Sequence, residues 1–196
     1  MKKGIVLWSV LLLMFFCACT KQEAAQDTES TLYINQDGSL DSLVVEDFPE
    51  EKYAAEELFP TIREIVDVYN QDHGSGCVKL LSCEVKDGQA FVKLHYKTGA
   101  DYAAFNRTTF FYGSVADGLA AGYGKKATLK NAYGSNMISG DAIADLSSYR
   151  MIVTGEPVQI RTYESILYYS ANLDLSDDKT GHVSSESGGE AVLIIK

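Results

Sequence analysis

The sequence predicts an α+β domain in which antiparallel hairpins form a mixed sheet, packed by one main helix and one or two short helices. Two Asp-Gly pairs, at residues 37–38 and 87–88, each lie between alternating apolar runs, which is typical of hairpins. A helical apolar pattern fills residues 53–70, and short segments rich in β-forming residues follow it. We expect residues 31–196 to form this domain as a single unit.

The two hairpins are the most specific local predictions. The first is expected over residues 31–47, around the turn at Gly38. In the second, over residues 78–97, a two-residue turn would pair Lys86 with Gln89. The same register places three further pairs on one apolar face: Val85 with Ala90, Cys83 with Val92, and Leu81 with Leu94.

The other elements follow from shorter patterns. In the main helix, residues 53–70, Pro60 must lie in the first turn or kink the helix. Short helices are expected at residues 101–106, 115–121 and 141–147. Strands are expected at residues 108–115, 149–154, 158–162, 165–171 and 191–195. A high density of glycines between residues 113 and 140 indicates the largest loop-rich region.

The charge balance limits the classes of partner. The chain has 196 residues, with 17 Lys and Arg against 27 Asp and Glu, so its formal net charge is −10. An acidic protein lacks the cationic surface that phosphate contacts require. We therefore expect no nucleic-acid partner.

The N-terminus has the pattern of an export signal. Lys2 and Lys3 precede an uncharged apolar stretch, residues 4–16, which is shorter than the ~20 residues that span a bilayer as a helix. This combination predicts a secretory signal peptide over residues 1–18. A plain signal peptide cleaved after Ala18, or an uncleaved anchor, would share the same features.

Residues 16–19, Phe-Cys-Ala-Cys, resemble the lipobox of bacterial prolipoproteins, although Phe16 stands where that family usually has leucine. The resemblance implies that Cys19 receives a diacylglyceryl thioether and becomes the first mature residue. Two long acyl chains give lasting attachment to a bilayer, which a single chain does not. The polar residues 19–30 suit a tether. The expected location is therefore the extracytoplasmic face of the cell membrane, where acylated Cys19 would attach the protein to the lipid bilayer.

The body of the chain, from residue 31 to about residue 171, is similar to a group of uncharacterised bacterial surface lipoproteins. The likeness is carried by residues 31–39, 45–48, 84–88, 101–106 and 166–170. A shorter likeness, over residues 84–94, is to the germination-type GerMN domain. The lipoprotein group has no known activity, so the resemblance implies no catalytic residue.

Cysteine and histidine spacing predicts no catalytic residue, metal site or cofactor. On one extended strand, Cys77 and Cys83 would lie roughly 20 Å apart, too far for a disulfide. We expect them to be small buried hydrophobic side chains. The histidines, His73, His95 and His182, share no ligand-like spacing with one another or with the cysteines.

One set of residues is a candidate ligand-binding surface for an envelope polysaccharide or a protein. It combines aromatic and cationic side chains among the glycines: Tyr112, Tyr123, Lys125, Lys126 and Tyr133. The competing interpretation is that the tyrosines pack at the edge of the core and the lysines are solvated.

Two functions remain open from the sequence. The first is a membrane-tethered extracytoplasmic lipoprotein whose domain is a non-catalytic binding or interaction module of the cell envelope. The alternative is a small carboxylate-dependent envelope hydrolase. The alternative requires two acidic side chains facing each other across a cleft, with the pKa of one of them raised. A deep pocket with His95 or His182 oriented by an acid would also favour an enzyme.

Overall fold

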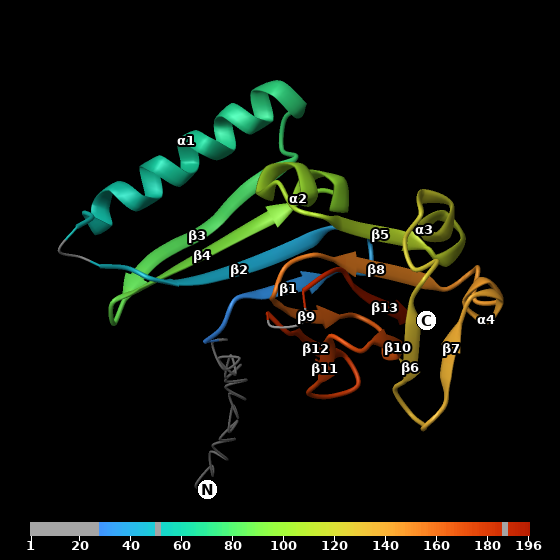
Figure 1. The fold of residues 1–196 in the computed structure, drawn as a ribbon. Helices are drawn as coiled ribbons and strands as arrows, with labels where there is room; N and C mark the ends of the chain where they lie inside the picture. Colours follow the sequence, from blue (N-terminus) through green and yellow to red (C-terminus); the bar gives the residue numbers. More distant parts are fainter. Residues whose placement is uncertain (1–27, 50–51, 186–187) are drawn as a thin grey trace, which may run out of the picture.

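The computed structural model describes residues 28–49, 52–185 and 188–196. Within them, thirteen strands and four helices are arranged around two sheets, so the predicted α+β class, with hairpins, one main helix and shorter helices, is confirmed. Figure 1 shows the two sheets side by side, with the longest helix over one of them. The expected Cys19 and most of the expected tether lie outside the described residues.

The larger sheet, sheet A, has seven strands in the order β11-β12-β9-β1-β2-β4-β3. It is mixed, because β1 pairs in parallel with β9 while the other neighbouring strands pair antiparallel. Its strands are β1 (Thr31–Ile34), β2 (Leu40–Asp47), β3 (Val78–Lys86), β4 (Gln89–Tyr96), β9 (Gln159–Thr162), β11 (Leu173–Leu175) and β12 (Thr180–Val183).

The smaller sheet, sheet B, is antiparallel and has six strands in the order β5-β8-β13-β10-β6-β7. Its strands are β5 (Phe110–Ser114), β6 (Thr128–Asn131), β7 (Met137–Ser139), β8 (Arg150–Thr154), β10 (Ile166–Ser170) and β13 (Ala191–Ile195). All five residues of β13 are buried. A strand with no exposed residue has both faces covered.

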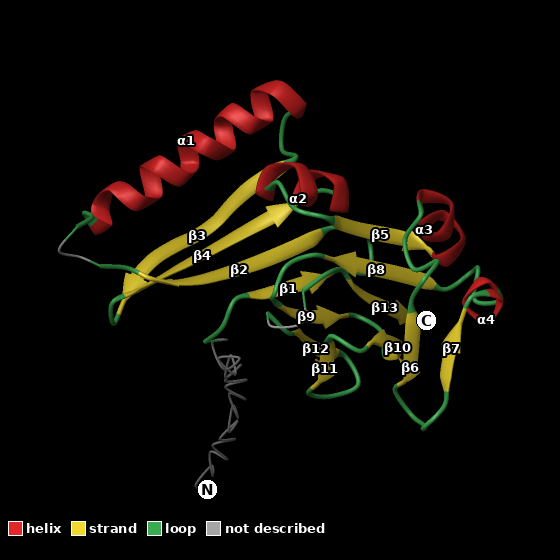
Figure 2. Cartoon of the chain, in the orientation of Figure 1, coloured by secondary structure: helices red, strands yellow, loops and turns green. Residues whose placement is uncertain are grey.

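The helices, drawn in red in Figure 2, are α1 (Ala55–His73), α2 (Gly99–Asn106), α3 (Val115–Ala121) and α4 (Asp141–Ala144). Two of them begin at a hydroxyl cap, which satisfies a backbone donor that the first turn leaves free. Thr98 accepts a hydrogen bond from the N–H of Asp101 in α2, and Ser114 accepts one from the N–H of Asp117 in α3. These caps fix where α2 and α3 start.

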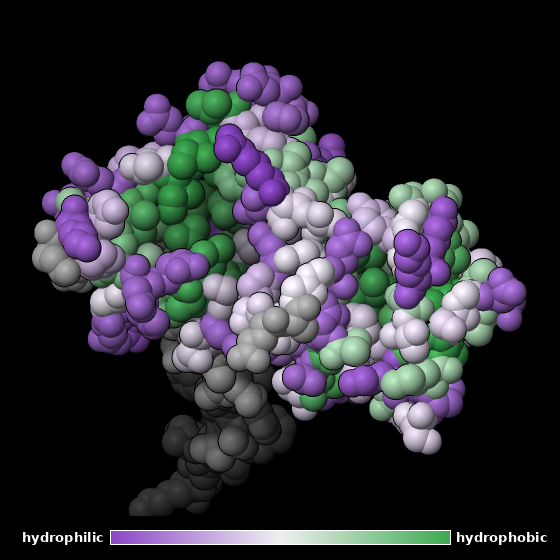
Figure 3. Space-filling view, viewed as in Figure 1, coloured by the Kyte–Doolittle hydropathy of each residue, from purple (hydrophilic) through white to green (hydrophobic). Residues whose placement is uncertain are grey.

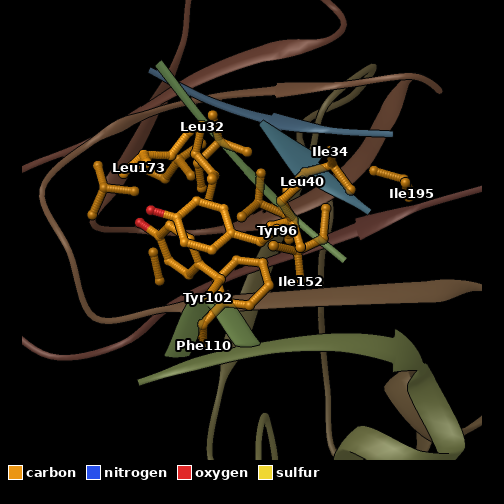
Figure 4. Packing of buried hydrophobic residues seen from close by; sticks show 14 of the residues in the cluster. Leu32, Ile34, Leu40, Tyr96, Tyr102, Phe110, Ile152, Leu173 and Ile195 are labelled. Carbon is orange, nitrogen blue, oxygen red and sulfur yellow. The ribbon is translucent and has the colours of Figure 1, made fainter. Parts of the chain in front are cut away.

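Sheet B separates two apolar cores. Ala191, Leu193 and Ile195 of β13 belong to the larger core, which also takes side chains from sheet A, α1 and α2. Val192 and Ile194 alternate with them and belong to a second core together with residues of α3 and α4. The larger core therefore joins the two sheets, and Figure 4 shows part of its packing.

Both predicted hairpins form, with one error of register. Asp87 and Gly88 both have positive φ, as a two-residue hairpin turn requires, and Lys86 pairs with Gln89. The prediction that Leu81 faces Leu94 is wrong, because the register shifts between Leu80 and Ser82. Leu80 pairs with Leu94 instead, and Leu81 is 56% exposed at the bulge.

Pro60 does not lie in the first turn of the main helix. The helix starts at Ala55, so Pro60 falls in its second turn and cannot donate to the carbonyl of Glu56. Both residues are exposed, so water is able to bind that carbonyl.

The glycine-rich region holds more structure than the sequence indicates. Strands β6 and β7 form a hairpin there, and β11 and β12 form another hairpin later in the chain that the apolar pattern does not reveal. These strands have only three or four residues each, too few for an alternating pattern to stand out.

The bulge gives a direct test of the register. Because Leu81 is exposed, Leu81→Thr should change the free energy of unfolding by no more than about 0.5 kcal/mol. Leu80 packs against the larger core, so Leu80→Thr should cost about 1–3 kcal/mol. Urea denaturation followed by circular dichroism measures both, and the opposite order would restore the register expected from the sequence.

Candidate functional site

The predicted tyrosine–lysine surface is not assembled as one surface. Tyr112 lies in β5 and packs against the larger core, where its hydroxyl is 3.1 Å from that of Tyr163. Tyr123 packs against the second core, with its ring 5.3 Å from Phe111. Because these cores lie on opposite faces of sheet B, Tyr112 and Tyr123 cannot contact the same ligand.

The other three predicted residues are more exposed. Lys125 and Lys126 line an open pocket of about 490 Å³ together with Glu190 and Val192. Tyr133 is 63% exposed and does not line that pocket. Of the five residues, the structure therefore brings together only the two lysines.

A more extensive apolar surface lies beneath α1. Val66 is the only residue of this 19-residue helix that is buried, while Ile62 and Tyr69 pack partly against the larger core. Ile65 and Val68 are 54% and 53% exposed. Figure 3 shows the resulting hydrophobic surface, which extends from below α1 across the adjoining strands.

The exposure of Ile65 and Val68 follows from the width of the apolar stripe on α1. Successive residues turn by about 100°, so Ile62, Val66 and Tyr69 form a central row toward sheet A. Ile65 and Val68 lie on one flank of that row. Sheet A covers the central row but not this flank, which leaves an apolar groove. We call this surface the α1 groove. Ile65 and Val68 border it on the helix, on the same flank of α1 as Leu58 and Thr61, which line a pocket together with Phe48.

A pocket of about 310 Å³ lies at the end of the α1 groove where the helix begins. Phe48 and Tyr53 contribute aromatic rings to it, with centroids 6.1 Å apart. The N–H of Phe48 donates to the carbonyl of Gly88 at 2.7 Å, which ties this end of the pocket to the hairpin turn. The remaining lining residues are Asp47, Pro49, Ala54, Glu57, Leu58 and Thr61.

A second, more polar cleft of about 260 Å³ lies where α2 meets β2 and the loop between β8 and β9. Tyr102 in its wall donates a hydrogen bond to the carboxylate of Glu156. Asn106 donates at 3.2 Å to the hydroxyl of Tyr96, whose ring is fully buried. In Figure 4 the hydroxyls of Tyr96 and Tyr102 point to the same side of the core.

Burial controls the ionisation of these two tyrosines. It raises the pKa of Tyr96, and it raises the pKa of Tyr102 further above its ordinary value, with the charge of Glu156 adding to the effect. Both phenols therefore stay neutral in the folded protein. Tyr96, Tyr102 and Glu156 were not singled out from the sequence, because nothing in their local patterns shows that these three distant positions meet.

Two of the histidines lie beside a carboxylate, but neither lines any of the pockets above. His182 Nδ1 lies 3.7 Å from Glu29 Oε2. His95 Nδ1 lies 2.8 Å from Asp41 Oδ1, but these are cross-strand neighbours of β4 and β2 and line none of the pockets above. Cys77 and Cys83 are not joined in a disulfide, as predicted, but both are half-buried and not buried as expected. Partial burial raises the pKa of both thiols. No group of three His, Cys, Asp or Glu residues among the described ones could hold a metal ion.

Comparison with protein families, curated proteins and solved structures finds no match for this chain. No helix in the described ranges is long and apolar enough to cross a bilayer.

Tyr102 gives a prediction for alkaline pH. Because the pKa of Tyr102 is raised in the folded protein, its contribution to stability is complete below pH 10. At higher pH the Tyr102 hydroxyl ionises in the unfolded chain but not in the folded one, so this contribution is lost. Tyr102→Phe should therefore reduce the alkaline slope of unfolding free energy by about 1.4 kcal/mol per pH unit. Urea titrations between pH 8 and 11.5 measure the slope, with the exposed Tyr133→Phe as control. An unchanged slope in Tyr102→Phe would contradict the assignment.

Proposed function

We propose that this protein is a membrane-tethered lipoprotein on the extracytoplasmic face, and that its domain is a non-catalytic binding module of the cell envelope. The N-terminal sequence supports the first part. A cationic start, a short apolar stretch and Phe-Cys-Ala-Cys precede a polar segment that ends where β1 begins, at Thr31. Ser30 already bonds to Val45 and Gln159 of sheet A, so the free tether is residues 19–28, which would span at most about 35 Å if fully extended.

The observation that carries the second part is the α1 groove. Exposed apolar side chains scattered singly are ordinary on protein surfaces, but a continuous patch marks an interaction site. Ile65 and Val68 lie beside each other on one flank of α1, next to the pocket that Phe48 and Tyr53 line. Ile65 and Val68 add little to folding where they are, whereas a bound partner would bury them.

A hydrolase would use the second, more polar cleft, where α2 meets β2, because Glu46 and Glu156 both lie in its wall. Glu156, however, already has a part in the fold as the acceptor for the buried Tyr102 hydroxyl. Without that acceptor, the hydroxyl would lose its partner at a cost of about 1–3 kcal/mol. The groove residues have no comparable part in the fold, so we favour binding over hydrolysis.

The tether is tested by Cys19→Ala. The variant should lose palmitate labelling and move from the membrane fraction to the soluble fraction or fail to be processed, because the two acyl chains are its proposed attachment. Fractionation followed by immunoblotting and metabolic labelling measures both. Membrane attachment that stays detergent-dependent in the unlabelled variant would contradict the lipid assignment.

Binding at the groove is tested in the native membrane by photo-crosslinking. A benzoylphenylalanine residue replaces Val68 in the full chain, and a matched control replaces Met137, which is equally apolar and 59% exposed on β7. We expect adducts with another envelope component from position 68 and none from position 137. Failure to form adducts at position 68, or the same adducts at both positions, would overturn a binding role for the groove.

A further inference from the structure

The charges that α1 itself places on the flank beside the groove are of one sign. At about 100° per residue, Glu57, Glu64 and Asp72 border the flank of α1 that carries Ile65 and Val68. The single arginine of the helix, Arg63, lies on the opposite flank, where it is 3.9 Å from Asp67. The helix side of the groove is therefore acidic along its length.

The strands add carboxylates at the end of the groove where α1 begins. Glu46 of β2 lines the polar cleft, and because it pairs with Ala90 and shares the face of Val44 it also borders this apolar surface. Among the eight residues that line the pocket at the end of the groove, Asp47 and Glu57 are charged and none is basic. An apolar floor between acidic borders selects a ligand that is apolar on one side and cationic on the other.

The edge of sheet A that lies beside α1, the β3 edge, is poorly suited to adding an extended peptide as another strand. The backbone of Val78, the first residue of β3, is already bonded to the side chain of Asn70. Asn70 donates to the carbonyl of Val78 at 2.8 Å and accepts from its N–H at 3.0 Å. The bulge at Leu81 interrupts the edge further along. The apolar surface beside α1 is free of both obstacles.

Resting on the proposed function, we infer that the α1 groove binds a basic amphipathic helix of a partner protein. The apolar side of that helix would lie against Ile65, Val68 and the Phe48 pocket, and its Lys or Arg side chains would face Glu57, Glu64 and Asp72. The 19 residues of α1 extend for about 28 Å, the length of roughly five turns of partner helix. Anionic lipid headgroups and a second acidic copy of this chain would both be repelled by the same borders.

Defined peptides test the inference on the full acyl-anchored chain in phosphatidylcholine nanodiscs, with binding to empty nanodiscs subtracted. The probe is a fluorescent 18-residue helix with leucines on one face and lysines on the other. One comparison peptide has the same composition in scrambled order, and another has glutamate in place of lysine. Fluorescence anisotropy should show the amphipathic lysine peptide binding at least about tenfold more tightly than either comparison peptide.

Variants of the chain separate apolar from electrostatic recognition. Ile65→Gln with Val68→Gln should weaken binding about tenfold, and Glu64→Gln with Asp72→Asn should weaken it and reduce its dependence on salt. Glu56→Gln with Asp67→Asn, on the other flank, is the matched control and should leave binding unchanged. All these side chains are exposed, so the variants should fold, which circular dichroism checks.

Four outcomes would overturn the inference. They are equal binding of the scrambled peptide, equal loss of binding in the control variant, tight binding that is unaffected by the groove variants, and preferential binding of the domain to phosphatidylglycerol vesicles. If position 68 still forms adducts in the native membrane while the peptides are not distinguished, the binding module stands and only its partner class is wrong.

Discussion

The fold depends on how one apolar face of sheet A is covered along its length. Near Tyr96 and Leu94 this face packs against sheet B and α2 in the larger core. The β3–β4 hairpin extends beyond sheet B, as Figure 1 shows, and there α1 lies over it. A single helix covers a narrower strip than a sheet does. The hairpin is therefore stably folded and yet leaves apolar surface beside the helix.

An aromatic junction holds the hairpin to sheet B. The ring of Tyr102 lies edge-on to that of Tyr96 and to that of Phe110, with centroids 5.0 Å apart in both pairs. Such contacts add to the free energy of burial. The tyrosine hydroxyls form hydrogen bonds at the edge of the core, that of Tyr102 with Glu156 and that of Tyr96 with Asn106. This junction fixes the end of the hairpin to which α1 is attached. There Asn70 of α1 forms two hydrogen bonds with the backbone of Val78 in β3.

Local signals predicted most of the fold, and tertiary contacts decided the rest. The Asp87-Gly88 turn was predictable because both residues need positive φ, which few sequences supply. The bulge was not, because Leu80 and Leu81 are equally apolar and either fits the core face. Proximity in sequence misled the choice of ligand-binding residues, since Tyr112 and Tyr123 meet different cores. The broad stripe of α1 was visible, but its exposed flank depends on how far sheet A reaches.

The carboxylates around the α1 groove have two consequences that support each other. An exposed apolar strip favours non-specific association, and like charges along its border oppose contact between copies of this chain and with anionic lipid. The same charges attract a cationic partner, so selection against wrong partners and recognition of the proposed one come from the same residues. Neutral polar borders would give neither effect. The acidic composition, which in the sequence only argued against nucleic acid, thus acquires a specific position in the structure along Glu57, Glu64 and Asp72.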